Sequence, residues 1–136
     1  MRDIFRVVIS PIPVSSNSRH IKMAKGIYVG NPKYLTWKTY AATKINIKVR
    51  EMKWITRDTP MSVRITVFMK NRRIDTSNLI KAVEDAAQGA RGVYSNDKMN
   101  DDIRITRYVN DSIKQEYVIF EAWDLEMDEQ GFVLDK

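Results

Sequence analysis

The sequence has no cysteine among its 136 residues, and it has a single histidine, His20. These absences exclude disulfide bonds, thiolate zinc sites and a cysteine nucleophile, and they argue against acid–base chemistry based on histidine. No apolar run approaches the roughly 20 residues of a membrane-spanning helix. The opening Met-Arg-Asp does not resemble a signal peptide. We therefore expect a cytoplasmic protein with no membrane association.

Acidic residues are scarce in the first half of the chain. Residues 1–73 contain sixteen Lys or Arg and three Asp or Glu, whereas residues 74–136 contain seven and fourteen. A cationic half of this strength favours a polyanionic partner such as nucleic acid. Part of the later acidic excess is a run that begins at Asp124. We expect residues 1–123 to form a single domain and residues 124–136 to form a solvated acidic tail.

The hydrophobic pattern predicts four strands and two helices. The expected strands cover residues 4–9, 61–69, 103–109 and 116–123, and the expected helices cover about 32–51 and 77–88. The basic segment 15–30 is predicted to be a mobile loop or a short hairpin. A turn at Asn110-Asp111 suggests that the last two strands pair as a hairpin. The order β-α-β-α-β-β predicts an α+β fold, with a mixed sheet and two helices in two layers.

The second predicted helix carries polar side chains along one face, because Asn78, Lys81 and Asp85 are three and four residues apart. Asp75 precedes the helix, where the helix dipole favours its negative charge. Lys81 is a cation near the same positive end of the helix. A residue that breaks a local rule in this way often marks a functional site. The alternative is an exposed Lys81–Asp85 ion pair, which contributes only about 0.3–0.5 kcal/mol.

Another carboxylate, Asp97, lies in the glycine-containing loop after this helix. We expect Asp75 and Asp97 to meet at one end of the sheet. Two adjacent carboxylates repel each other unless a cation lies between them or one is protonated. Oxygen ligands of this type suit Mg²⁺, which also accepts phosphate oxygens and can activate water. The alternative is that both aspartates are helix caps and turn formers.

These residues resemble the signature of the RusA family of Holliday-junction resolvases. In that family, a strand and a basic segment precede Asp-x-Asp-Asn-Leu-x-Lys, a helix with an internal aspartate, an acidic pair, and a strand that ends in a basic residue. This chain supplies, in order, Asp75, Asn78, Leu79, Lys81, Asp85, Asp97 and Arg107. The resemblance extends over roughly residues 4 to 123 and includes the first strand, the basic segment and the first helix.

The resemblance implies a homodimeric endodeoxyribonuclease that acts on four-way DNA junctions in recombination and repair. Cleavage would need Mg²⁺, with Mn²⁺ as a substitute, and no small-molecule cofactor. Asp75 and Asp97 would hold the metal, and Lys81 would contact the scissile phosphate or stabilise the transition state. The residues with supporting roles would be Asn78, Asp85 and Arg107. The residues that bind DNA phosphates would be Arg19, His20, Lys22, Lys25, Lys70, Arg72 and Arg73.

Two positions depart from the family pattern. The second aspartate of the motif is Ser77 here, and the first member of the later acidic pair is Asn96. A hydroxyl and an amide are weaker metal ligands than carboxylates, so we expect reduced metal affinity. A second alignment register would make Asp101-Asp102 the acidic pair. Three functions remain open: a resolvase, a catalytically weakened or inactive branched-DNA-binding protein of the same fold, and an accessory protein that binds RNA or protein.

Overall fold

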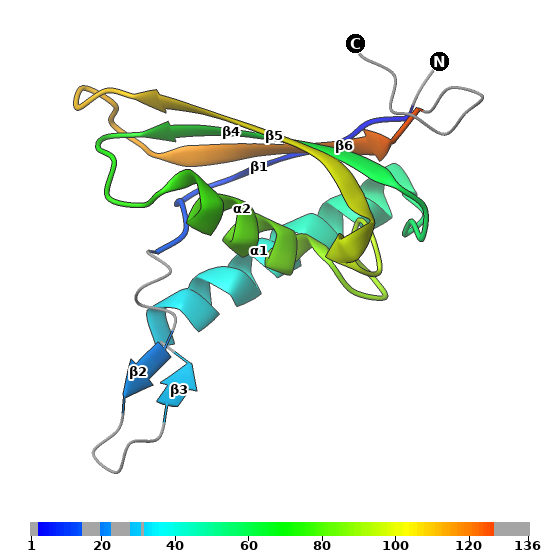
Figure 1. Ribbon diagram of the computed structural model, residues 1–136, viewed down its shortest axis with the longest axis horizontal. Coiled ribbons are helices and arrows are strands. Elements are labelled where there is room, and N and C mark those ends of the chain that lie inside the picture. Colours follow the sequence, from blue (N-terminus) through cyan, green and yellow to red (C-terminus); the bar gives the residue numbers. More distant parts are fainter. Residues whose placement is uncertain (1–2, 15–19, 23–27, 31, 127–136) are drawn as a thin grey trace.

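The computed structural model describes residues 3–14, 20–22, 28–30 and 32–126. A four-stranded mixed sheet is packed against two helices, and this confirms the predicted α+β fold (Figure 1). The strands of the sheet are β1 (Phe5–Ile9), β4 (Met61–Met69), β5 (Asn100–Val109) and β6 (Tyr117–Asp124). The helices are α1 (Pro32–Met52), α2 (Thr76–Ala87) and the short 3₁₀ helix η2 (Asp97–Met99).

The basic segment contains a small hairpin, one of the two alternatives expected for it. Strand β2 (His20–Lys22) pairs antiparallel with β3 (Tyr28–Gly30). Of the predicted DNA-binding residues in this segment, Arg19 and Lys25 lie outside the described residues, and only the backbone of His20 and Lys22 is described.

The strand order of the sheet is β1-β6-β4-β5. Strands β4 and β5 are parallel and are joined through α2, whereas β6 is antiparallel to both β1 and β4. The expected hairpin between the last two strands is therefore wrong, because β4 lies between them. The segment 110–116 is long enough to cross the roughly 10 Å of two strand spacings. Strand β4 is central and six of its nine residues are buried, whereas the edge strand β5 carries four charged residues.

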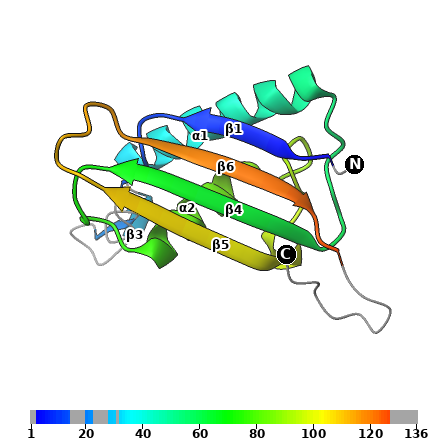
Figure 2. The ribbon, with the colours of Figure 1, turned by 90° about the horizontal axis from the view of Figure 1, so that it is seen from above.

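Both helices cover the same face of the sheet (Figures 1 and 2). Alternate residues of β4, from Val63 to Met69, are buried on that face. Helix α1 contributes residues spaced by three and four, among them Trp37, Ala41 and Ile45. Within the described ranges, no helix combines the length and the apolar character that crossing a membrane requires.

The other face of the sheet has no helix over it in the described part of the chain (Figure 2). Three aromatic rings stack across its strands there. The ring of Phe68 lies 5.0 Å from that of Tyr108 and 4.6 Å from that of Tyr117, measured between centroids. Because cross-strand aromatic pairs stabilise a sheet, this row supports the pairing of β4 with β5 and β6.

The first residues of the acidic C-terminal run contact the rest of the domain. Asp124 is the last residue of β6, and its carboxylate accepts a hydrogen bond from Arg57 Nε at 3.0 Å. The next backbone N–H, of Leu125, donates to the carbonyl of Pro60 at 3.0 Å. Strand β6 therefore includes the first residue of the predicted tail, and residues 127–136 of that tail lie outside the described residues.

Candidate functional site

Asp75 is the N-cap of α2, as the cap interpretation predicted. Its Oδ1 accepts a hydrogen bond from the backbone N–H of Asn78 at 2.9 Å and another from the Ser77 hydroxyl at 3.0 Å. The side chain is nevertheless exposed. A carboxylate has about four acceptor positions, so capping leaves room for a cation or another donor. Ser77, a predicted metal ligand, therefore helps to orient Asp75.

Asp97 lies at the opposite end of the same helix. Its backbone N–H donates to Oε1 of Gln88, the C-cap residue of α2, at 3.2 Å. The preceding Asn96 caps η2 by accepting from the N–H of Lys98 at 2.9 Å. Since α2 has twelve residues, it separates Asp75 from Asp97 by about 18 Å. The expectation that these two carboxylates meet at one end of the sheet is wrong for a single chain.

The direction of α2 explains this separation. A helix that connects two parallel strands must run back along the sheet, so its two ends lie at opposite ends of the strands. Asp75 follows the C-terminal end of β4, and Asp97 precedes the N-terminal end of β5 (Figure 1). Among the described residues, no group of three or more His, Cys, Asp or Glu side chains could hold a metal ion.

Lys81 projects from the middle of α2 and is paired. Its Nζ lies 3.3 Å from Oδ1 of Asp85, and the Lys81 side chain is 51% exposed. The other oxygen of Asp85 accepts a hydrogen bond from the Tyr34 hydroxyl of α1 at 3.2 Å. The ion-pair alternative is therefore confirmed. Because the pair leaves half of the lysine in solvent, the ammonium group can still donate to a phosphate.

A second carboxylate of α2, Glu84, was not singled out from the sequence. It is only 8% exposed, and its Oε2 accepts from Nδ2 of Asn100, the first residue of β5, at 2.8 Å. The hydroxyl of the buried Tyr94 approaches the carbonyl oxygen of Glu84 at 3.4 Å. Burial raises the pKa of Glu84, the Asn100 hydrogen bond opposes this, and the nearby charge of Asp97 adds to it. The sequence did contain a signal for the burial of Glu84, because this residue lies among alanines and a valine on the apolar side of α2.

We expect Glu84→Gln to stabilise the protein by about 1 kcal/mol at pH 8 and to have little effect at pH 4. The folded-state pKa of Glu84 is raised, so wild-type stability falls as pH rises from the unfolded pKa through the folded one. Glutamine cannot ionise, and its carbonyl oxygen can still accept from Asn100. Urea unfolding at both pH values measures the difference. Glu51→Gln, at an exposed residue of α1, is the control. If it changes the free energy of unfolding by the same amounts at the two pH values, burial of Glu84 is not the cause of the stabilisation.

The basic segment before α2 is fixed by one acidic residue. Arg73 donates through Nη1 and Nη2 to the two carboxylate oxygens of Glu116 at 2.8 and 2.6 Å, and the backbone N–H of Lys70 also donates to Glu116 at 2.8 Å. The hydrogen bond from Arg73 lowers the pKa of Glu116, and the same bond raises the pKa of Arg73. Arg73 is therefore already paired with Glu116, although its side chain, like those of Lys70 and Arg72, is exposed.

Arg107 of β5 fixes the entry to α2. Its Nη1 donates to the carbonyl oxygen of Ile74 at 2.9 Å, immediately before Asp75. This contact connects the far end of β5 to the cap of α2, and it gives a structural basis for the supporting role expected of Arg107.

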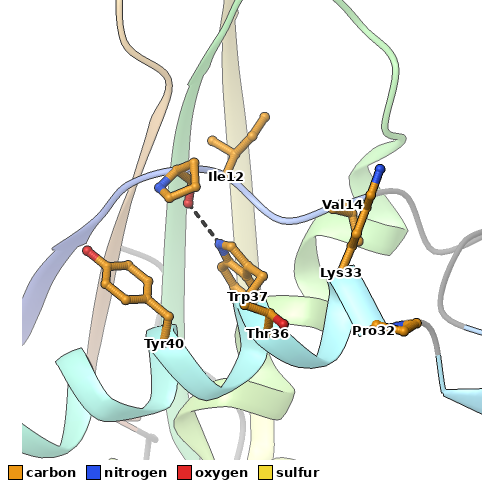
Figure 3. A pocket seen from close by; sticks show the side chains of 8 residues that line it. Ile12, Val14, Pro32, Lys33, Thr36, Trp37 and Tyr40 are labelled. Carbon is orange, nitrogen blue, oxygen red and sulfur yellow. Dashed lines mark hydrogen bonds between the residues drawn. The ribbon is translucent and has the colours of Figure 1, made fainter.

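A pocket of 540 Å³ lies between the segment after β1 and the N-terminal half of α1 (Figure 3). Its lining includes Ile12, Tyr40 and Trp37, whose Nε1 donates to the carbonyl of Pro11 at 2.8 Å. None of the predicted site residues lines this pocket, so it is separate from the candidate site on α2.

The chain matches the family model described as Endodeoxyribonuclease RusA over residues 11–118. No curated protein matches it. The matched range contains α1, β4, α2, η2 and β5, and therefore every candidate residue from Arg19 to Arg107. With most of the chain covered, the protein belongs to the RusA endodeoxyribonuclease family.

Proposed function

We propose that this protein is a metal-dependent endonuclease that resolves four-way DNA junctions as a homodimer. Family membership supports an endonuclease of the Holliday-junction resolvase type. The observation that carries the proposal is the exposed carboxylate of Asp75 at the start of α2. It lies about 9 Å along the helix axis from the half-exposed Lys81 and two residues after the basic segment 70–73. A carboxylate beside cations suits a metal ion that meets a DNA phosphate.

The metal site of this proposal needs two chains. Because α2 separates Asp75 from Asp97 by about 18 Å, one chain cannot give both carboxylates to one ion. We infer that a two-fold dimer places Asp75 of one protomer beside Asp97 of the second. Their oxygen atoms fit Mg²⁺ or Mn²⁺, with Ser77 and Asn96 as weaker ligands. A bound Mg²⁺ would supply Lewis-acid activation of the phosphate and of a water molecule.

The chain's own residues orient this site. The backbone N–H of Asn78 and the Ser77 hydroxyl hold the carboxylate of Asp75 in one position. Asp85, held in turn by Tyr34, positions the ammonium group of Lys81 along α2, where it can stabilise charge on a phosphate. The exposed side chains of Lys70 and Arg72 are placed to bind neighbouring phosphates. Arg73, bound to Glu116, would mainly hold the segment in place.

Cleavage of synthetic DNA tests this function. We expect symmetric nicks in a four-way junction with Mg²⁺ or Mn²⁺, and much weaker cutting of three-way and linear DNA of the same sequence. A chelator should stop the reaction. Equal cutting of linear and four-way DNA, or cutting in the chelator, would contradict the proposal.

A branched-DNA-binding protein with weak or no catalysis is the second candidate. It is favoured by Ser77 and Asn96, because both side chains are engaged in local hydrogen bonds and neither carries a charge. In this case the wild type binds four-way junctions in a salt-sensitive manner and does not cut them. Ser77→Asp would then create cutting activity, because it adds a carboxylate next to Asp75. Junction binding without cutting in the wild type would support this second function, and cutting in Ser77→Asp would identify the protein as a disabled nuclease.

A further inference from the structure

We propose that β5 is the dimer edge, and that it pairs antiparallel with β5 of a second copy around a two-fold axis at Ile103. The inference rests on the dimer of the proposed function and identifies the surface that forms it. The two sheets would then join into one continuous sheet with all four long helices on the same side.

Strand β5 is suited to such pairing because it is an edge strand. It lies at the end of the order β1-β6-β4-β5, and in the described part of the chain it has a neighbouring strand on one side only (Figure 2). With ten residues, it is longer than the other three described strands of the sheet. A long edge strand presents a row of unpaired backbone N–H and C=O groups, which is a template for adding another strand.

The charges along β5 are arranged for an antiparallel copy. Asp101 and Asp102 precede Ile103, and Arg104 and Arg107 follow it. A parallel copy would place like charges side by side, whereas an antiparallel copy places acidic residues beside basic ones. With Ile103 on the axis, Asp102 lies opposite Arg104 of the second protomer, and this pair occurs twice.

Asp102 and Arg104 can each make this additional contact. They lie on the face of the sheet away from the helices, since Arg104 is in register with the exposed Arg64. Within one chain, Arg104 Nε is 3.3 Å from Asp102 Oδ1, and Ser62 donates to Asp102 Oδ2 at 3.0 Å. The guanidinium group has four more N–H donors, and a carboxylate has further acceptor positions. A second copy can therefore join these groups without breaking the existing bonds.

Ile103 is an exposed apolar side chain on the opposite, helix-covered face. It is 38% exposed, although its neighbour in register, Val63, is 1% exposed. The isoleucine of a second protomer, placed directly opposite, would cover it.

This pairing also brings the two halves of the proposed metal site together. Asp97 lies shortly before the start of β5, and Arg107 near its end contacts Ile74, the residue before Asp75. In an antiparallel pair, the start of one β5 lies beside the end of the other, so Asp97 approaches Asp75 of the second protomer. A dimer formed through the sheet faces that no described helix covers would not bring Asp97 close to Asp75 of the second protomer. It would place both helix layers on the outside of sheets about 10 Å apart.

A single introduced cysteine tests the position of the axis, because the protein has no cysteine of its own. We expect Ile103→Cys to form a disulfide-linked dimer under mild oxidation, since residues opposite each other in an antiparallel pair have Cα atoms about 4.5–5.5 Å apart. Val8→Cys is the matched control, because Val8 is 43% exposed on the other edge strand, β1. If a non-reducing gel shows no more disulfide-linked dimer for Ile103→Cys than for Val8→Cys, the inference is overturned.

Charge reversal provides an independent measurement. We expect Arg104→Asp to weaken the dimer at least about tenfold in sedimentation experiments, and the double variant Asp102→Arg with Arg104→Asp to restore it. Thermal unfolding of each variant separates a folding defect from a dimer defect. Equal dimer affinity in the wild type and Arg104→Asp would overturn the inference. Neither experiment uses DNA cleavage, so a confirmed β5 dimer that does not cut would exclude only the nuclease function.

Discussion

Asp75→Asn is expected to lower four-way junction cleavage at least about 100-fold while leaving junction binding within about threefold. The substitution removes the charge that would bind the metal but keeps the side-chain oxygen that accepts from the N–H of Asn78. Asparagine and aspartate are similar N-caps, so helix α2 should keep its stability. Cleavage rates at saturating protein and gel-shift affinities in the absence of divalent metal measure the two effects separately.

Asp111→Asn is the control for Asp75→Asn, because Asp111 is an exposed aspartate in the turn between β5 and β6. It should cut at the wild-type rate. If Asp75→Asn also cuts at the wild-type rate, Asp75 is not a metal ligand and its role is limited to capping α2. Loss of both cleavage and binding together would point instead to a disrupted fold, which a thermal unfolding curve would reveal.

A mixture of two inactive variants is expected to regain activity. Asp75→Asn and Asp97→Asn should each be inactive alone, because each removes one ligand from both sites of the dimer. In an equal mixture with free exchange, half of the dimers contain one chain of each kind, and one of their two sites has both aspartates. Nicking should therefore recover to about one quarter of the wild-type rate. The recovered dimers cut only one strand of a junction, so full resolution stays low.

The control for this mixture is Asp75→Asn combined with a double variant that carries both substitutions. No dimer in that mixture contains an intact site, so it should remain inactive. If the first mixture also remains inactive although the chains exchange, the two aspartates do not act together across a dimer. Chain exchange is verified by mixing a tagged wild type with an untagged one and purifying through the tag.

The sequence was sufficient to predict the fold class and most elements of the sheet. Alternation over residues 61–69 and the periodicity from Pro32 both correspond to observed elements, because apolar side chains at those spacings must face one core. Strand pairing was harder to predict. The turn at Asn110 and Asp111 is compatible with a hairpin, but local turn chemistry does not show that β4 lies between the two strands.

The candidate site was predicted in part. Local signals were reliable: Asp75 caps α2, Lys81 pairs with Asp85, and Arg107 ends up beside the start of the helix. The prediction that Asp75 and Asp97 lie close together was wrong, because their separation depends on the direction of α2. That direction follows from the parallel pairing of β4 with β5. Glu84 was missed because its significance arises only from burial against Asn100, sixteen residues later.

The length of α2 has a consequence for how the protein would behave in a cell. If the two aspartates cannot act within one molecule, a newly synthesised monomer cannot cut DNA until it binds a second chain. Below the dissociation constant of the pair, the rate of DNA cutting would rise with the square of the protein concentration. The amount of protein synthesised would then determine when chromosomes are exposed to cleavage, without any separate inhibitor.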